Sequence, residues 1–142
     1  MRIVCLVSCS KQKAAGSTAA EHLYTSPRFR FARAYARGKF DAWYILSAKH
    51  FLVEPSKVLD PYDLSLNDMA LADRKVWARQ VADELVIRES PPKHLTILAG
   101  ESYRVPLVGF LNNLGYIIDV PLAHMDQGTQ LKWLKEQARE YS

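Results

Sequence analysis

The stretch RIVCLVS at residues 2–8, which runs directly into the polar loop CSKQK at residues 9–13, decides the predicted fold. A short apolar run bounded by polar residues is typical of a strand that is buried on both faces. Three further segments show the same pattern: Ala42–Leu46, His94–Ala99 and Tyr116–Val120. If these strands are parallel, the polar clusters that follow them meet at one edge of the sheet, where open α/β folds bind ligands.

Helical patterns fill the connections between the predicted strands. Ser26 and Pro27 are typical of a helix start, and the helix is expected to end at Gly38. Three more helices are expected: from Asn67 or Asp68 to Arg88, from Ser102 to Asn113, and from Thr129 onward. Right-handed crossovers then predict a single domain over residues 1–142, a three-layer α/β/α sandwich with a four-stranded parallel sheet in the order 2-1-3-4.

Composition is that of a folded protein with a basic amino-terminal part. The 142 residues are 49% hydrophobic and 24% charged, with a net charge of +4. Glu21 is the only acid among the first 40 residues, and a basic excess of this kind suits a phosphorylated ligand or nucleic acid. Arg30, Arg33 and Arg37 fall on one helical stripe and are candidate nucleic-acid contacts; a solvated helix face is the alternative interpretation.

The amino terminus is not typical of a signal peptide, because its apolar run is short and Lys11 follows at once. No segment approaches a membrane span, so no membrane partner is expected. Cys5 and Cys9 are too few for a disulfide framework, which fits a reduced, cytoplasmic compartment.

The loop after the first strand is a candidate phosphate site. Ser10, Lys11 and Lys13 combine a hydroxyl and two ammonium groups with the backbone N–H groups at a strand end. The spaced glycines of a P-loop and of a dinucleotide fingerprint are missing, so no cofactor is expected. Cys9 is a candidate ligand contact and, beside a lysine, a candidate nucleophile or redox thiol; a buried small residue is the alternative interpretation.

A second candidate cluster follows the second strand. His50 can serve as an acid or base near neutrality, Lys49 can polarise an oxyanion, and Asp63 can orient water. Ser47 and Tyr62 are candidate ligand contacts, Tyr62 by stacking on a base. In the alternative interpretation Asp63 caps a turn and Tyr62 packs in the core.

A third cluster opens the helix after the third strand. Glu101, Tyr103 and Arg104 lie at a position suited to anion recognition; the alternative interpretation, which is favoured for Glu101, is a helix-capping residue. No metal is expected, because no ligand pair has metal spacing. The side chains that could act as metal ligands by residue type are those of Cys9, His50, His124 and Asp126.

Several motifs resemble those of small proteins grouped with the peroxide-stress protein YaaA. They are VSCSKQK at 7–13, LYTS at 23–26, YILSAKH at 44–50 and PYDL at 61–64. The strand order is also similar to that of the uracil-DNA-glycosylase architecture. These resemblances imply a compact α/β domain connected with DNA.

The resulting functional hypothesis is an enzyme that acts on a nucleotide or nucleic acid by cleavage or exchange at an N-glycosidic bond. Asp63 would stabilise the cationic sugar or aim water, and Lys49 or His50 would neutralise the departing base. The phosphate groups would be held by Lys11, Lys13 and Arg104. The alternatives are a non-catalytic DNA- or nucleotide-binding stress-response protein that uses the arginine stripe, and a redox role for Cys9.

Overall fold

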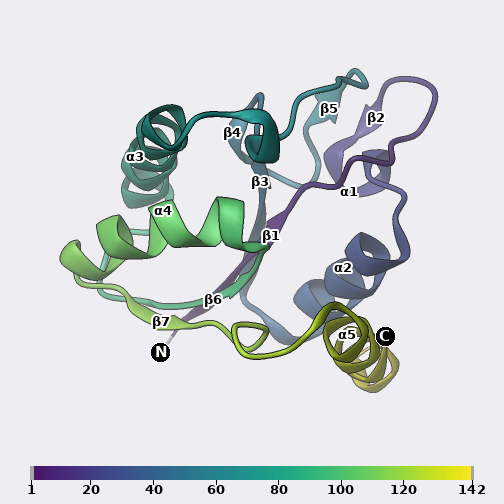
Figure 1. Cartoon of the computed structure of the whole chain (residues 1–142). Coiled ribbons are helices and arrows are strands. Elements are labelled where there is room, and N and C mark those ends of the chain that lie inside the picture. Colours follow the sequence, from purple (N-terminus) through teal and green to yellow (C-terminus); the bar gives the residue numbers. More distant parts are fainter. Residues whose placement is uncertain (1, 142) are drawn as a thin grey trace.

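The computed structural model describes residues 2–141 and shows an α/β fold, as predicted, around a mixed sheet (Figure 1). The sheet has five strands in the order β4-β3-β1-β6-β7. Four of them run parallel and coincide with the predicted strands: β1 (Ile3–Ser8), β3 (Ala42–Ser47), β6 (His94–Leu98) and β7 (Ile117–Asp119). Their carboxyl ends therefore lie at one edge of the sheet.

Helices cover both faces of the sheet (Figure 1). One face carries α3 (Leu71–Arg88) and α4 (Glu101–Asn113), and the other carries α2 (Pro27–Lys39) and α5 (Gln127–Tyr141). Alternate β1 residues supply the two cores, because successive strand side chains point to opposite faces: Leu6 packs with the α3 and α4 side and Val7 with the α2 side. Within residues 2–141, no helix combines the length and the apolar character needed to cross a membrane.

The predicted four-stranded, purely parallel sheet is wrong, because β4 (Phe51–Val53) adds an antiparallel edge strand next to β3. The two strands are joined by a tight turn at residues 48–50, and Phe51 closes this turn with a φ of 65°. Three-residue hairpin loops commonly end with a residue in this left-handed conformation, usually glycine. Phenylalanine gives no such signal in the sequence, so the hairpin was not predicted.

The left-handed backbone of Phe51 leads to a stability prediction. We expect Phe51→Gly to have a free energy of unfolding about 1 kcal/mol higher than Phe51→Ala, because both changes remove the ring but only alanine retains a Cβ that is strained at positive φ. At a strand position with negative φ, glycine would be the less stable of the two. Urea unfolding of both variants measures the difference, and an advantage for alanine would contradict it.

The long connection Ser47–Leu66 is ordered, as expected. It contains β4 and β5 (Val58–Leu59), and β5 pairs with β2 (Thr18–Ala19), which the sequence did not predict. Backbone bonds from Ala20 N to Lys57 O (2.7 Å) and from Glu21 N to Pro55 O (2.9 Å) fasten the short helix α1 (Ala20–Leu23) to this segment. The connection then passes through the 3-10 helix η1 (Leu66–Asp68) into α3.

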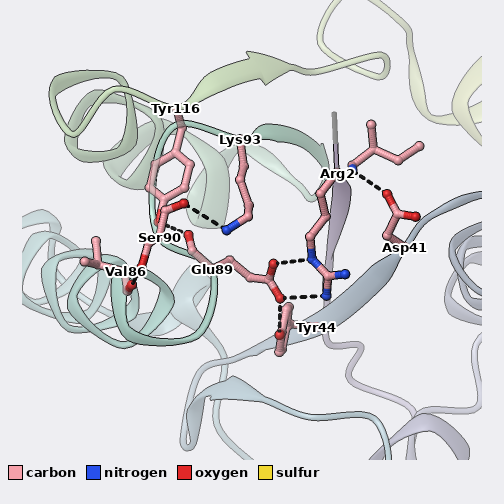
Figure 2. A network of polar contacts seen from close by, with 9 residues as sticks. Arg2, Asp41, Tyr44, Val86, Glu89, Ser90, Lys93 and Tyr116 are labelled. Atoms are coloured by element: carbon pink, nitrogen blue, oxygen red, sulfur yellow. Dashed lines mark hydrogen bonds and ion pairs between the residues drawn. The ribbon is translucent and has the colours of Figure 1, made fainter.

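At the amino ends of the strands, the buried carboxylate of Glu89 connects α3 to the sheet (Figure 2). Glu89, which ends α3, is 3% exposed and accepts two hydrogen bonds from Arg2, from Nε at 2.8 Å and Nη2 at 3.2 Å. The Tyr44 hydroxyl donates to the same carboxylate at 2.7 Å, and the Tyr116 hydroxyl donates to the Glu89 backbone carbonyl at 2.7 Å. This network lies near the amino ends of the strands, away from the carboxyl ends where the cleft opens, so its role is to stabilise the fold.

Candidate functional site: a cleft at the carboxyl edge

A cleft of about 320 Å³ opens beyond the carboxyl end of β1. One wall is the loop after β1, with Cys9, Ser10, Lys11 and Lys13. A second wall, the carboxylate wall, is the segment at residues 63–68, and Tyr103 from the first turn of α4 also lines the cleft. A smaller cavity of about 30 Å³ adjoins Cys9 and Ser10 on the α2 side, which leaves room for about one water molecule.

The loop with Lys11 and Lys13, called the lysine wall here, is stabilised by a hydrogen bond to β3 and by two side-chain hydrogen bonds to its own carbonyl groups. Cys9 N donates to Leu46 O of β3 at 2.9 Å, Ser10 Oγ donates to Gln12 O at 3.1 Å, and Lys13 Nζ donates to Lys11 O at 3.3 Å. Lys11 is exposed and Lys13 half-buried. Burial lowers the pKa of Lys13, while the charges of Cys9 and Asp63 act in the opposite direction. The two cleft walls are therefore close enough to interact electrostatically.

Tyr103 places a protonated hydroxyl in the cleft. Its Oη lies 3.2 Å from Cys9 Sγ. Burial raises the pKa of Tyr103 well above its ordinary value, and the neighbouring Cys9 adds to the increase. The hydroxyl consequently keeps its proton at neutral pH and can donate it in a hydrogen bond, either to the sulfur or to a ligand in the cleft.

A chain of buried hydroxyl groups lies behind the cleft. Tyr62 Oη is 2.7 Å from Ser47 Oγ and 2.6 Å from Tyr24 Oη. Ser47 is fully buried at the end of β3, where its Oγ also accepts from His50 N at 3.0 Å and its carbonyl accepts from Trp77 Nε1 at 2.9 Å. Burial raises the pKa of Tyr24 to about 12 and raises that of Tyr62 further, so both remain neutral.

The ring of Tyr62 is covered rather than open. Lys13 Nζ lies 4.4 Å from its centroid, within the range of a cation–π contact, and the His50 ring meets it at 5.3 Å with an interplanar angle of 83°. Stacking of Tyr62 on a base, as hypothesised, would require Lys13 to move. Its contacts agree with the alternative interpretation of a packed residue.

The three candidate catalytic residues do not come together in the cleft. Asp63 is exposed and lines the cleft with Lys11 and Lys13. Lys49 and His50 do not line it, and Lys49 Nζ is 6.0 Å from the Tyr62 ring centroid. Burial lowers the pKa of His50, and the nearby charges of Lys49 and Lys57 lower it further. His50 is therefore neutral at pH 7, but it faces Tyr62 and not the cleft.

Of the third cluster, only Tyr103 lines the cleft. Glu101 is exposed as the first residue of α4 and does not line the cleft, and the N-cap of this helix is Gly100 with no capping side chain. Arg104 lies outside the cleft lining, and its buried Nε has no hydrogen-bond partner within residues 2–141.

Two of the three arginines in the α2 stripe interact with Glu21 of α1. Arg33 Nη1 donates to Glu21 O at 2.8 Å, and Arg37 Nη1 lies 3.5 Å from the Glu21 carboxylate. Arg30 is exposed, and its guanidinium group forms neither a hydrogen bond nor an ion pair within residues 2–141, although its backbone N–H donates to Ser26 O at 3.0 Å. Internal contacts thus compete with phosphate groups for two of the three guanidinium groups.

Sequence reasoning missed part of the second cleft wall. Besides Asp63, this wall contains Ser65, Asn67 and Asp68, and the Asn67 side chain accepts a hydrogen bond from the Ser102 hydroxyl. The sequence signal for it is the density of short polar side chains directly after Asp63, of which Asn67 and Asp68 alone indicate a helix start. Across residues 2–141, no three His, Cys, Asp or Glu side chains come together in a group that could hold a metal ion.

Comparisons with known proteins place the chain in a family. A family described as "Family of unknown function (DUF6884)" matches residues 4–136. The uncharacterized protein YfjM of Bacillus subtilis (strain 168) is 36% identical over 115 residues, which cover 73% of this chain and 73% of YfjM. No solved structure matches the chain. The resemblance to the YaaA group and to the uracil-DNA-glycosylase architecture is therefore wrong, because the matches lead to a different family.

Proposed function

The chain belongs to the family of unknown function DUF6884, and we propose that it binds a nucleotide in the cleft and cleaves or exchanges its N-glycosidic bond. One observation carries the proposal: two lysines and the carboxylates of residues 63–68 line the same cleft of about 320 Å³. Such a site suits a ligand that is anionic at one end and rich in hydrogen-bond donors at the other.

The lysine wall supplies the contacts for phosphate. Lys11 and Lys13 each carry an ammonium group with three N–H donors, and Ser10 adds a hydroxyl. A nucleotide phosphate placed there would leave the sugar next to the wall that contains Asp63, Asn67 and Asp68. Carboxylate and amide oxygens accept hydrogen bonds from sugar hydroxyls, which gives the second wall a role in orienting the ligand.

Asp63 supplies the charge that glycosidic-bond cleavage requires. As the C1′–N bond breaks, the sugar becomes cationic, and a carboxylate beside C1′ stabilises it. Water then adds a hydroxyl group to C1′, and its proton leaves with the base. Tyr103 lines the cleft with a protonated hydroxyl beside Cys9 Sγ, and this hydroxyl can donate a hydrogen bond to the departing base. Since Lys49 and His50 do not line the cleft, this mechanism does not use them.

The test begins with thermal shift measurements on nucleobases, nucleosides, nucleotides, and single- and double-stranded DNA. Ligands that shift the melting temperature are then incubated with the protein, and released base is quantified by chromatography. Binding without base release would overturn the catalytic part of the proposal. A shift with DNA alone, abolished by salt and by Arg30→Ala, would instead favour a non-catalytic DNA-binding protein.

The Asp63→Asn variant separates catalysis from binding. We expect it to release base at least about 100-fold more slowly, because the amide cannot stabilise a cationic sugar, while the dissociation constant of the nucleotide changes by less than about threefold. Asp83→Asn, an exposed aspartate of α3, is the matched control and should behave as the unmodified protein. Equal rates for Asp63→Asn and Asp83→Asn would exclude Asp63 from the reaction.

A further inference from the structure

We propose that Tyr62 is a positioning residue that holds the carboxylate wall of the cleft against the lysine wall. The role of this geometry in nucleotide binding rests on the proposed function, but the positioning itself does not. The segment that carries Asp63 is irregular between β5 and η1, so no sheet or helix ladder fixes it. The side chain directly before Asp63 is the one that enters the protein.

The hydroxyl of Tyr62 reaches two different parts of the fold. Its contact to Ser47 Oγ at 2.7 Å joins the segment to the end of β3, and its contact to Tyr24 Oη at 2.6 Å joins it to the residue after α1. Ser47 is fully buried and Tyr24 is 1% exposed. If the Tyr62 hydroxyl moved away, the buried Tyr24 hydroxyl would lose its partner and Ser47 would keep only the bond from His50 N, so the closed arrangement is favoured.

Tyr24 is in turn bonded to the lysine loop through the backbone. Lys13 and Tyr24 form an antiparallel bridge, flanked by hydrogen bonds from Ala14 N to Leu23 O (2.8 Å) and from Thr25 N to Gln12 O (3.0 Å). The path from Asp63 to Lys13 therefore consists of one peptide bond, one hydroxyl pair and one backbone bridge.

The ring of Tyr62 provides a second, direct link. Lys13 Nζ lies 4.4 Å from the ring centroid and also 5.8 Å from that of Tyr24. The ammonium group is thereby held on the face of Tyr62 while Lys13 lines the cleft. Tyr62 thus defines the position of a carboxylate through its backbone and that of a cation through its ring.

The experiment is limited proteolysis of Tyr62→Phe with thermolysin, which cleaves before leucine and would cut at Leu64 or Leu66. Phenylalanine keeps the ring under Lys13 and loses both hydroxyl contacts. We expect cleavage in residues 60–66 to become about ten times faster, because local opening becomes easier. Tyr24→Phe removes one of the two contacts and should give a smaller increase.

Tyr35→Phe is the control for loss of a tyrosine hydroxyl elsewhere. Tyr35 Oη accepts from Lys39 Nζ at 3.2 Å and packs against Trp133 and Tyr141 of α5. Cleavage at Leu64 or Leu66 should not change in this variant. If Tyr62→Phe and Tyr35→Phe are cleaved at the same rate as the unmodified protein, the positioning role is overturned, whether or not a nucleotide binds.

The functional consequence is tested with the nucleotide that gives the largest thermal shift. If Tyr62 acts by holding Asp63, Tyr62→Phe lowers the rate of base release, and adding it to Asp63→Asn causes no further loss. If the rate loss of the double variant equals the product of the two single losses, Tyr62 does not act through Asp63. If no nucleotide binds, the proposed function fails, while the proteolysis result still decides the positioning role.

Discussion

Replacing Glu89 with alanine is expected to lower the free energy of unfolding by about 3 kcal/mol, because charge-assisted bonds from Arg2 are lost and the Tyr44 hydroxyl loses its buried acceptor. Glu89 also joins the end of α3 to the amino end of the sheet (Figure 2). Urea unfolding at neutral pH measures the change. Glu140→Ala, an exposed glutamate of α5, is the control and should shift the free energy by less than about 0.5 kcal/mol.

The contribution of Glu89 has a defined pH dependence. The hydrogen bond from Arg2, and in addition that from Tyr44, lower the pKa of Glu89 below its ordinary value of 4.5. The pKa of Glu89 is lower in the folded than in the unfolded state, so the ionised carboxylate stabilises the fold above pH 4.5. This stabilisation is lost as the pH falls through the folded-state pKa. Unmodified protein should therefore exceed Glu89→Gln in stability at pH 7 and lose most of that advantage in strong acid. A difference that does not change with pH would contradict this account.

The parallel strands could be predicted from the sequence because each is a short apolar run that ends in polar residues. The edge strand β4 could not, since it is three residues long and follows a turn whose left-handed residue is Phe51. Period-two patterns cannot be recognised in so few residues, and the usual glycine signal is absent. The same limitation applies to the two-residue strands β2 and β5, which exist only because they pair with each other.

The site was predicted where the carboxyl ends of parallel strands meet, and the structure brings the lysine loop and Asp63 together around one cleft. The positions of Lys49 and His50 depend on the β3–β4 turn, which places them near Tyr62 and outside the cleft lining. The environment of Tyr62 depends on Tyr24, which is 38 residues away in sequence. Contacts of this kind arise from tertiary packing, and one sequence contains no local signal for them.

Replacing both Lys11 and Lys13 with alanine is expected to weaken nucleotide binding by about 100-fold or more. A hydrogen bond between an ammonium group and a phosphate contributes about 1.5–3 kcal/mol, and about 1.4 kcal/mol corresponds to a factor of ten in the dissociation constant. Both lysines line the cleft, and Lys13 is half-buried there. Isothermal titration calorimetry with the nucleotide that gives the largest thermal shift measures the effect.

The control for this double variant is Lys132→Ala combined with Lys135→Ala, which removes the same charge from exposed positions of α5. General electrostatic attraction by a chain of net charge +4 would weaken equally in both double variants and would be screened by salt. Direct phosphate contacts in the cleft would instead make the first double variant far weaker than the second at every salt concentration. Equal losses in the two would mean that the phosphate does not bind between the lysine and carboxylate walls, and the proposed nucleotide site would then be wrong.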